Sequence, residues 1–459
     1  MKHYDAIIIG AGQAGMPLAR SISKKGLKVA LIEKRAIGGT CINDGCSPTK
    51  TMVASARVAH LVSRASDFGV YVDGYRVDQK KVKSRKNHIV ELFRGGAEKA
   101  LEKAENVDII MGQAVLKDKR TVEVQRETGE VFELKADKIF IDTGSEPDIP
   151  EVDGLESVPY LDSTSIMELE ETPEHLIILG GGYIGLEFGQ MFRRFGSNVT
   201  IMDVAPRLVP KEDKDVCEEI ARIFNEENIA TVFDVKVTRV AYSQEEITLF
   251  YEGDSGAAEI KGSHLLISTG RKPSTASLGL EETGVKLTDR GHIWIDGSYQ
   301  TSVDGIYALG DVAGSPPFTH MAYHDAHLVF QQIYEGVNLD PNGRVVPYCV
   351  FIDPQLARIG LNEQQAKEKG MDYKIGKFLM RHAGRALEVD ETNGFFKVLV
   401  DPGSKKILGA TVLSIDGGEV MAVLQMAMVG GVTYDKISNL PIAHPTLAES
   451  LNNLMGQIK

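Results

Sequence analysis

Cys41 and Cys46 are the residues of this chain best suited to chemistry, because only four residues separate them in the run GGTCINDGCSPTK at positions 38–50. The apolar periodicity from Thr51 to Ala65 predicts a helix directly after this run, which places the second sulfur at a helix N-terminus. The positive end of the helix dipole favours a thiolate there and lowers the pKa of the cysteine. A disulfide across so short a loop adds little stability, so the pair indicates a redox centre. Two unrelated buried cysteines are the alternative.

A glycine-rich turn near the N-terminus predicts a dinucleotide site. The elements expected around it are a strand at Tyr4–Ile9, the turn Gly10-x-Gly12-x-x-Gly15, a helix from Gln13 to Lys25, and a strand at Lys28–Ile32 that ends at Glu33. Glycines let backbone amides approach a pyrophosphate at the helix N-terminus. The acidic residue is placed to accept a hydrogen bond from a ribose 2′-hydroxyl.

The same device returns 170 residues later. Its elements are a strand at His175–Leu179, the turn Gly180-x-Gly182-x-x-Gly185, a helix at Tyr183–Phe195, and a strand at Asn198–Met202 that ends at Asp203. In both copies 23 positions separate the first glycine from the acidic residue. Two dinucleotide sites beside a redox cysteine pair imply electrons that move between two cofactors and a disulfide.

Three further strand ends belong to this arrangement. Phe140–Ser145 and Leu266–Arg271 match each other, and we expect each to close one nucleotide domain. Ile306–Asp311 predicts a buried strand whose Asp311 faces a ligand at the carboxyl edge of a sheet, although a helix cap is the alternative. From Val345 onward, strands with hairpin turns at Phe395–Val400 and Ile407–Leu413 are typical of a separate interface domain.

Composition describes an ordinary globular protein of several domains. The 459 residues are 25% charged and 43% hydrophobic, and 51 basic against 64 acidic residues give a net charge of −13. This charge disfavours nucleic acid and anionic membranes as partners. The apolar run at Ala6–Ile9 is too short for a signal peptide or a membrane span, so we expect a cytoplasmic protein. Four cysteines are too few for a disulfide scaffold.

These motifs resemble those of the flavoprotein disulfide reductases, the family of dihydrolipoamide dehydrogenase, glutathione reductase and mercuric reductase. The resemblance covers essentially the whole chain and rests on GGTCINDGCSPTK, GGGYIGLEFG, STGRKP, YALGDV and AHPTLAES. Two other segments, PTKTMVASARVAHL and GRALEVDETNGFFKV, look closest to mercuric-reductase-like proteins and to a bacterial reductase linked to reactive chlorine stress and copper.

The resemblance implies an α/β fold with two Rossmann-like domains of the three-layer ββα type, for FAD and NAD(P), and a C-terminal α+β dimerisation domain. We expect residues 1–147 to begin the FAD domain, 148–273 to form the NAD(P) domain, 274–340 to complete the FAD domain, and 341–459 to form the dimerisation domain.

The resemblance further implies that FAD binds at the first glycine turn. Glu33 would contact its adenosine ribose and Asp311 its ribityl chain, while a helix starting near His320 would direct its amides at the flavin. Lys50 would lie near the flavin N5 atom and pair with Glu187. Further FAD contacts are implied for Ala114, Thr143, Gly144 and Thr319.

Nicotinamide dinucleotide would bind at the second turn, where Tyr183 resembles the ring that covers the flavin until nicotinamide displaces it. Further contacts are implied for Val237, Gly270 and Arg271. The carboxylate of Asp203 favours NADH, because it accepts from a 2′-hydroxyl and repels a 2′-phosphate. Arg207, four positions on, keeps NADPH as the alternative.

The relay implied by the family runs from NADH to FAD and then to a Cys41–Cys46 disulfide. Cys46 would lie nearer the flavin, and Cys41 would attack the substrate. His444, oriented by Glu449, would act as general acid and base for the thiols. In the family this pair comes from the other subunit, so a homodimer is expected.

The electron acceptor is the open question, with a small disulfide or thiol compound first and a metal ion second. Mercuric reductases carry a second cysteine pair near the C-terminus, where this chain has none, and Cys217 and Cys349 are interpreted as packing residues. Ile442 stands where dihydrolipoamide dehydrogenases commonly have another histidine. A non-catalytic redox sensor is a third possibility.

No metal ligands are predicted. His320 and His324 share a helix face, with His327 one turn on, and could bind a metal. The alternative is a solvated or flavin-contacting helix face.

Overall fold

The computed structural model describes residues 2–254, 256–339 and 341–459. They divide into two compact units, and each is described here by itself. The first unit comprises residues 1–51, 81–148 and 270–344, and the second comprises residues 52–80, 149–269 and 345–459. Each unit contains one of the two glycine-rich turns.

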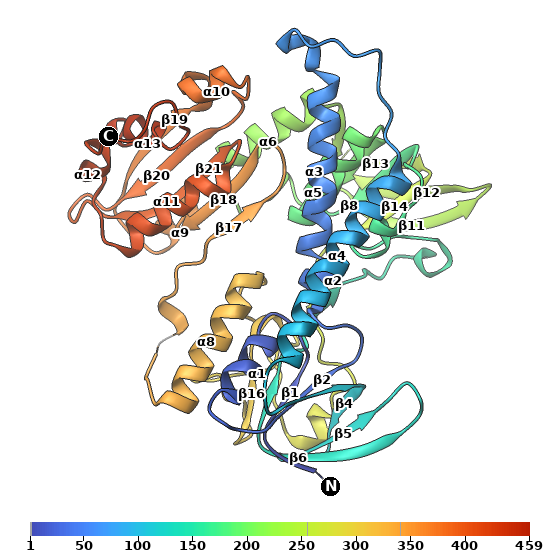
Figure 1. Ribbon diagram of the computed structural model, residues 1–459. Helices are drawn as coiled ribbons and strands as arrows, with labels where there is room; N and C mark the ends of the chain where they lie inside the picture. Colours follow the sequence, from blue (N-terminus) through green and yellow to red (C-terminus); the bar gives the residue numbers. More distant parts are fainter. Residues whose placement is uncertain (1, 255, 340) are drawn as a thin grey trace. The chain divides into compact units, whose positions relative to one another are not determined.

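The first unit is built on a seven-stranded sheet in the order β3-β2-β1-β6-β5-β4, with β16 paired to β6 (Figure 1). The strands are β1 (Lys2–Ile9), β2 (Val29–Glu33), β3 (Val107–Met111), β4 (Gln113–Leu116), β5 (Thr121–Gln125), β6 (Val131–Ile141) and β16 (Ile306–Ala308). The strands β1, β2, β3, β6 and β16 pair in parallel. Strands β2 and β16 and the C-terminal residues of β1 and β6 are buried apolar runs, as expected where a sheet is covered on both faces.

Helices α1 (Gly15–Ser23) and α8 (Thr319–Glu335) pack together on one face of this sheet, as Figure 1 shows. Leu18 and Ile22 of α1 and Val329 of α8 are fully buried against Ile8 and Leu31. The other face is covered by the residues around α7 (Leu280–Thr283). The strand β15 (Arg271–Pro273) pairs with β7 (Ser145–Pro147) in the same unit.

The second unit contains a four-stranded parallel sheet in the order β10-β9-β8-β14. Its strands are β8 (His175–Leu179), β9 (Asn198–Met202), β10 (Ile229–Val232) and β14 (His264–Ile267). Helices α5 (Tyr183–Phe195) and α6 (Lys214–Glu226) flank it, and an antiparallel sheet of β11 (Lys236–Ser243), β12 (Glu246–Gly253) and β13 (Gly256–Gly262) forms a third layer through a shared apolar core. The predicted ββα layering is confirmed.

The C-terminal part of the second unit is a five-stranded antiparallel sheet in the order β17-β18-β21-β20-β19. The strands are β17 (Tyr348–Val350), β18 (Gln355–Gly360), β19 (Lys374–Leu379), β20 (Phe395–Val400) and β21 (Ile407–Ser414). Its helices are α9 (Glu363–Glu368), α10 (Gly384–Glu388), α11 (Gly417–Val429), α12 (Tyr434–Ser438) and α13 (Ser450–Gly456). The strands predicted at Phe395–Val400 and Ile407–Leu413 are therefore present.

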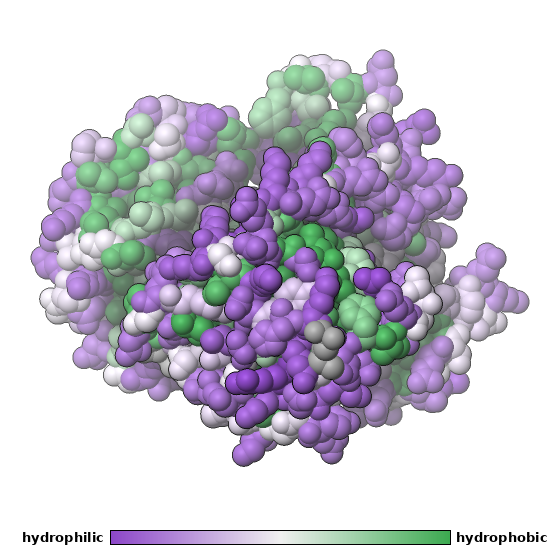
Figure 2. All heavy atoms as spheres, turned by 60° about the horizontal axis from the view of Figure 1, so that its bottom comes forward, coloured by the Kyte–Doolittle hydropathy of each residue, from purple (hydrophilic) through white to green (hydrophobic). Residues whose placement is uncertain are grey.

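Three more helices complete the description: α2 (Gly39–Asn43), α3 (Cys46–Ser63) and α4 (Gln79–Glu102). Within the described residues, none of the helices combines the length and apolar character needed to cross a membrane. Polar and charged side chains cover most of the face in Figure 2, with hydrophobic side chains gathered in separate patches.

Candidate active site

The cysteine pair lies on two consecutive helices of different length. Cys41 is in the middle of the short α2 and is half-buried, whereas Cys46 is the first residue of α3 and is exposed. The Sγ atom of Cys46 lies 3.2 Å from the Oγ1 atom of Thr319, the first residue of α8. The prediction that Cys46 lies at a helix N-terminus is correct. The predicted start at Thr51 is wrong, because Pro48 is tolerated in the first helical turn.

The thiol of Cys46 acts on the pKa of Cys41. The side-chain hydrogen bond with Cys46 and burial raise the pKa of Cys41 above its ordinary value, while Thr319 and Lys50 lower it. Lys50 is therefore a cation that acts on this sulfur. This arrangement suits a pair that shares one negative charge when reduced.

The first glycine turn is closed against the end of β6. Gly10 has a φ of +105°, and a Cβ atom there would lie 2.2 Å from the carbonyl oxygen of Asp142. A Cβ atom on Gly15 would lie 2.0 Å from the carbonyl oxygen of Gly10. Glu33, at the end of β2, accepts from the amide nitrogens of Ala11 at 2.9 Å and Arg35 at 2.8 Å. These features fit the turn of a dinucleotide site.

The residues predicted to contact FAD all belong to the first unit. Asp311 lies in the 3-10 helix Gly310–Ala313 and accepts from the hydroxyl of Ser145 at 2.6 Å. Arg271 donates to the same hydroxyl at 2.9 Å and to the Ser145 carbonyl oxygen at 2.5 Å. Burial raises the pKa of Asp311, while Ser145 and Arg271 lower it.

Two other predicted contacts, Thr143 and Gly144, follow the end of β6 and are hydrogen-bonded to Ser274. Thr143 donates its hydroxyl to the carbonyl oxygen of Ser274 at 2.8 Å, and the carbonyl oxygen of Gly144 accepts from the Ser274 amide at 3.0 Å. Ala114 is a buried residue of β4. Asp142 was not among the predicted site residues, although its carboxylate accepts from the Gly15 amide of the turn.

The second glycine turn repeats the first. Gly180 has a φ of +107°, and a Cβ atom there would lie 2.4 Å from the carbonyl oxygen of Ser268. A Cβ atom on Gly185 would lie 2.1 Å from the carbonyl oxygen of Gly180, whereas one on Gly182 would meet nothing within 4 Å. This turn also fits a dinucleotide, with open space at its middle glycine.

Asp203 ends the second copy as Glu33 ends the first. Its carboxylate accepts from the amides of Gly181 at 2.5 Å and Ala205 at 2.8 Å. Arg207 is half-buried, and its Nε atom has no hydrogen-bond partner among the described residues. Arg207 therefore keeps the NADPH alternative open.

Two other predicted nucleotide contacts lie in different units. Val237 lies on β11 of the second unit, whereas Gly270 begins the third segment of the first unit.

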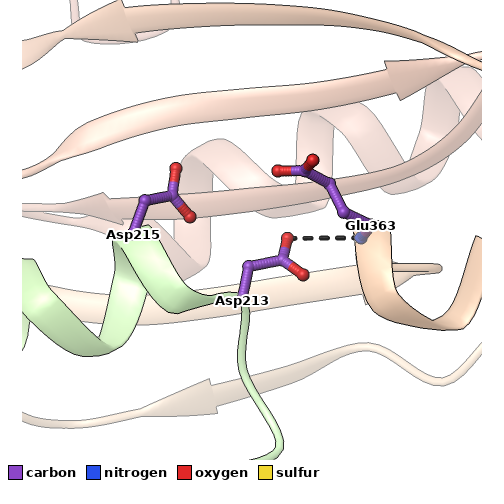
Figure 3. Close-up of side chains that lie close together, drawn as sticks. All are labelled: Asp213, Asp215 and Glu363. Atoms are coloured by element: carbon purple, nitrogen blue, oxygen red, sulfur yellow. Dashed lines mark hydrogen bonds between the residues drawn. The ribbon is translucent and has the colours of Figure 1, made fainter.

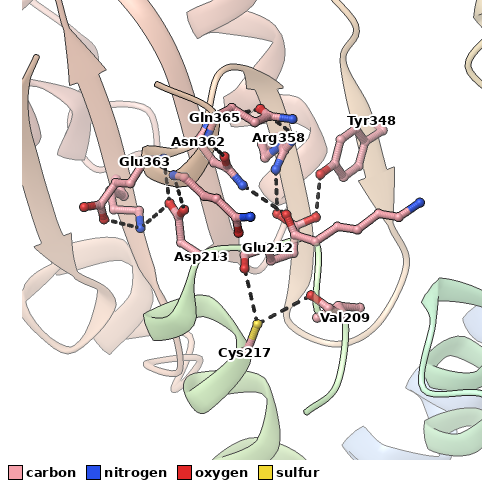
Figure 4. Close-up of polar contacts among 12 residues, drawn as sticks. Val209, Glu212, Asp213, Cys217, Tyr348, Arg358, Asn362, Glu363 and Gln365 are labelled. Atoms are coloured by element: carbon pink, nitrogen blue, oxygen red, sulfur yellow. Dashed lines mark hydrogen bonds and ion pairs between the residues drawn. The ribbon is translucent and has the colours of Figure 1, made fainter. Parts of the chain in front are cut away.

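Tyr183 belongs to a buried network centred on Glu212, shown in part in Figure 4. The fully buried carboxylate of Glu212 accepts from the hydroxyls of Tyr183 at 2.6 Å and Tyr348 at 2.5 Å, and from Arg358 at 3.2 Å. The two tyrosine rings are 5.6 Å apart. Burial first, and then Glu212, raises the pKa of Tyr183, so the phenol stays protonated. Glu187 is buried and accepts from the Phe351 amide at 2.7 Å.

His444 and Glu449 form the predicted pair. The Nδ1 atom of His444 lies 2.8 Å from one carboxylate oxygen of Glu449 and 3.1 Å from the other. The side chain of His444 is 73% exposed, whereas that of Glu449 is 35% exposed. Thr446 holds this loop, because its hydroxyl donates to the Ala443 carbonyl oxygen and accepts from the Glu449 amide. The imidazole ring of His444 is thus exposed, and a carboxylate anchors it at Nδ1.

One acidic cluster in the described residues has the spacing of a metal site, but an ammonium group occupies it. Asp213, Asp215 and Glu363 face one another in Figure 3. The buried Nζ atom of Lys397 contacts their carboxylates at 2.7, 2.7 and 3.0 Å. The histidines of α8 do not form such a cluster: His320 stacks on Phe318, and His324 approaches Arg344.

Sequence reasoning missed two residues of these sites. Asp142 could have been found from the sequence, since alignment of the matched strand ends FIDTGS and LISTGR shows a carboxylate where the second copy has Ser268. Glu212 could not have been, because its partner Tyr348 lies 136 residues away in the chain.

Comparisons with known proteins agree with this geometry. A family model described as pyridine nucleotide-disulphide oxidoreductase matches residues 4–326, and a model for the dimerisation domain of the same family matches residues 346–455. The chain is 36% identical over 463 residues to RclA of Escherichia coli (strain K12), with 100% of both chains covered. A solved Cu(II) complex of that HOCl-induced flavoprotein disulfide reductase has a TM-score of 0.91 at 35% identity, again with 100% of both chains covered.

Two other relatives have different named activities. A mercuric reductase of Lysinibacillus sphaericus is 35% identical, with 98% of this chain and 81% of the relative covered. A dihydrolipoyl dehydrogenase of Geobacillus stearothermophilus is 32% identical, with 97% and 94% covered.

Proposed function

This chain belongs to the pyridine nucleotide-disulphide oxidoreductases, and we propose that its electron acceptor is a small disulfide of the lipoamide type. It is an FAD-dependent oxidoreductase in which electrons pass from NAD(P)H through FAD to a redox-active disulfide. Its fold is the two Rossmann-like domains and C-terminal dimerisation domain of that family.

The observation that carries the proposal is the hydrogen bond of His444 with Glu449. Reduction of a disulfide RSSR by the Cys41–Cys46 dithiol forms the protein disulfide and releases two thiols, so each leaving thiolate must receive a proton. A histidine anchored at Nδ1 can deliver that proton from Nε2. Overall, NADH, one proton and RSSR give NAD⁺ and two RSH.

The residues that would hold the cofactors are those of the two turns. When bound, the flavin accepts a hydride from the nicotinamide and passes two electrons to sulfur. Glu33, Asp311, Ala114, Thr143, Gly144 and Thr319 would position FAD, and Asp203, Val237, Gly270 and Arg271 would position the nucleotides. Lys50 with Glu187, and the Tyr183 ring, would act beside the flavin.

The match to a dimerisation domain supports a homodimer. Each catalytic centre would then combine Cys41 and Cys46 of one subunit with His444 and Glu449 of the partner subunit. The high exposure of the His444 side chain is consistent with a group that serves a neighbouring molecule. We also retain the four predicted segments, divided at residues 147, 273 and 340, and a cytoplasmic location, where NADH is supplied.

The first test separates the two half-reactions. Cys46→Ser should leave reduction of the flavin by NADH intact and abolish lipoamide turnover, because the dithiol can no longer form. Cys349→Ser, at a half-buried strand position, is the matched control and should keep full turnover. Lipoamide turnover by the Cys46→Ser protein would refute the relay.

A second test addresses the acid–base pair. His444→Gln should lower disulfide turnover about 100-fold or more, within the range of general acid–base catalysis, and leave flavin reduction unchanged. The exposed His382→Gln is the control. Equal rates for the two variants would remove His444 from the mechanism.

A metal-ion reductase is the second candidate, favoured by the Cu(II) complex of the relative RclA. The dithiol would reduce two Cu(II) ions to Cu(I), with formation of the Cys41–Cys46 disulfide and release of two protons. This reaction needs no proton donor for a leaving thiolate. Cu(II)-stimulated NADH oxidation that survives His444→Gln but not Cys46→Ser would therefore favour this function over the first.

A further inference from the structure

Asp142 is a buried carboxylate set into the first glycine turn. It follows β6 directly, and its Oδ2 atom accepts from the amide of Gly15 at 2.7 Å and from that of Ala14 at 3.3 Å. The side chain is enclosed by glycines, because a Cβ atom on Gly12 would lie 2.9 Å from Oδ2 and one on Gly310 would lie 3.2 Å from Oδ1. The carboxylate therefore occupies the N-terminal amides of α1 from inside the protein.

The surroundings of this group disfavour its negative charge. Burial raises the pKa of Asp142 well above its ordinary value, the two amides oppose this, and the carboxylates of Asp311 and Asp325 add to it. Asp325 is itself compensated by Tyr299, Ser315, the Gly310 amide and Arg344. Burial raises the pKa of Asp311, whereas Arg271 and His292 lower it, and Glu33 accepts from the Ala11 amide of the same turn.

The second turn has no carboxylate at the matching position. Ser268 stands there, and its hydroxyl donates to the carbonyl oxygens of Leu179 and Gly180, each at 3.0 Å. A neutral group thus supports the second turn, whereas an ionisable group supports the first.

A dinucleotide brings a pyrophosphate to the N-terminus of the helix that follows the turn. At the first turn this places further negative charge near a buried carboxylate that, among the described residues, is hydrogen-bonded only to the backbone amides of Gly15 and Ala14. We propose that Asp142 is a cofactor-positioning residue whose carboxyl takes up one proton from solvent when FAD binds. In the neutral form it still accepts from the Gly15 amide through an oxygen, but it no longer repels the phosphates.

Proton uptake can be measured directly on the full-length apoprotein. FAD is titrated by calorimetry in two buffers of different protonation enthalpy, from mildly acidic to alkaline pH. We expect uptake to rise towards one proton per FAD, and FAD affinity to fall by up to about tenfold per pH unit in that range. NAD⁺ titrated into the FAD-loaded protein is the internal control for the second turn, and should show no uptake.

Variants assign the proton to the residue. Asp142→Asn should abolish both the uptake and the pH dependence of FAD affinity, whereas Glu146→Gln, at an exposed carboxylate nearby, should keep both. Uptake that persists in Asp142→Asn would overturn the proposal. If that variant does not fold, the native protein still decides, because FAD binding without proton uptake at every pH would also overturn it.

Discussion

At Gly10 and Gly180 the backbone has nearly the same φ, +105° and +107°, and each glycine is pressed against the carbonyl oxygen of a residue that follows a parallel strand. In both copies the acidic residue at the end of the second strand accepts the amide of the turn's second residue. The copies differ in the residue that supports the turn, Asp142 in one and Ser268 in the other. Backbone geometry is thus shared, while the supporting side chain sets the local charge.

Substitution of the third glycine of each turn should give the largest difference in effect between the two copies. A Cβ atom would lie 2.0 Å from a carbonyl oxygen in Gly15→Ala and 2.1 Å from one in Gly185→Ala, and such overpacking costs roughly 1–3 kcal/mol or more. We expect the first variant to lose FAD and its visible absorbance, and the second to keep FAD but lose reduction by NADH. Gly95→Ala, which meets nothing within 4 Å, is the control. A colourless Gly185→Ala protein would show that the copies are not independent.

Substitution of the acidic residue that follows each turn should have a smaller effect, seen for Asp203 in the preference for NADH over NADPH. Asp203→Asn removes the negative charge that disfavours a 2′-phosphate, so kcat/KM for NADH relative to NADPH should fall about tenfold, equivalent to about 1.4 kcal/mol. Glu33→Gln should leave this ratio unchanged and weaken FAD retention instead. Steady-state kinetics with both nucleotides measures the ratio. A clear NADPH preference of the native protein would contradict the role of Asp203.

The pH dependence of unfolding sharpens the contrast between Asp142 and Ser268. Because burial raises the pKa of Asp142, the folded protein keeps a proton that the unfolded chain loses near the ordinary aspartate value. Stability should therefore fall as pH rises from that value towards the folded pKa, by up to about 1.4 kcal/mol per pH unit. Denaturant unfolding across this range should show the slope in the native protein and not in Asp142→Asn. The same slope in both proteins would assign it to another group.

Ser268→Ala should have the smallest effect. It removes a neutral hydroxyl whose single hydrogen is shared between two carbonyl oxygens, each 3.0 Å away, and such a hydrogen bond contributes roughly 0.5–1.5 kcal/mol. We expect a modest loss of stability with no change in its pH dependence and no loss of FAD. Thermal unfolding measures the first two, and the absorbance of the purified protein the third. Loss of FAD would mean that the second turn supports the first.

Local patterns made the elements around both turns predictable. The bounds Tyr183–Phe195 are those expected, since a glycine precedes the helix and Gly196, with a φ of +116°, ends it. The start of α3 at Cys46 was not predicted. The helix was expected to begin after Pro48, but a proline is tolerated in the first helical turn. His444 and Glu449 lie five positions apart, so a short motif was enough to pair them.

The rest depends on contacts that only the fold creates. Asp142 meets Gly15 across 127 positions, and Glu212 meets Tyr348 across 136. The metal-like spacing of Asp213, Asp215 and Glu363 has its explanation in Lys397, which no pattern in the chain connects to them. Burial and charge at such points follow from tertiary packing, so sequence spacing alone does not reveal them.

The central claim is that electrons from the nicotinamide end on the sulfurs of Cys41 and Cys46. The most direct measurement is an anaerobic titration of the oxidised, FAD-loaded protein with NADH, in which solvent-reactive thiols are counted by alkylation and mass spectrometry. We expect that one NADH is consumed for the two thiols that appear, at Cys41 and Cys46, and that Cys46→Ser gains none. Oxidation of NADH with no new thiol at either position would contradict it.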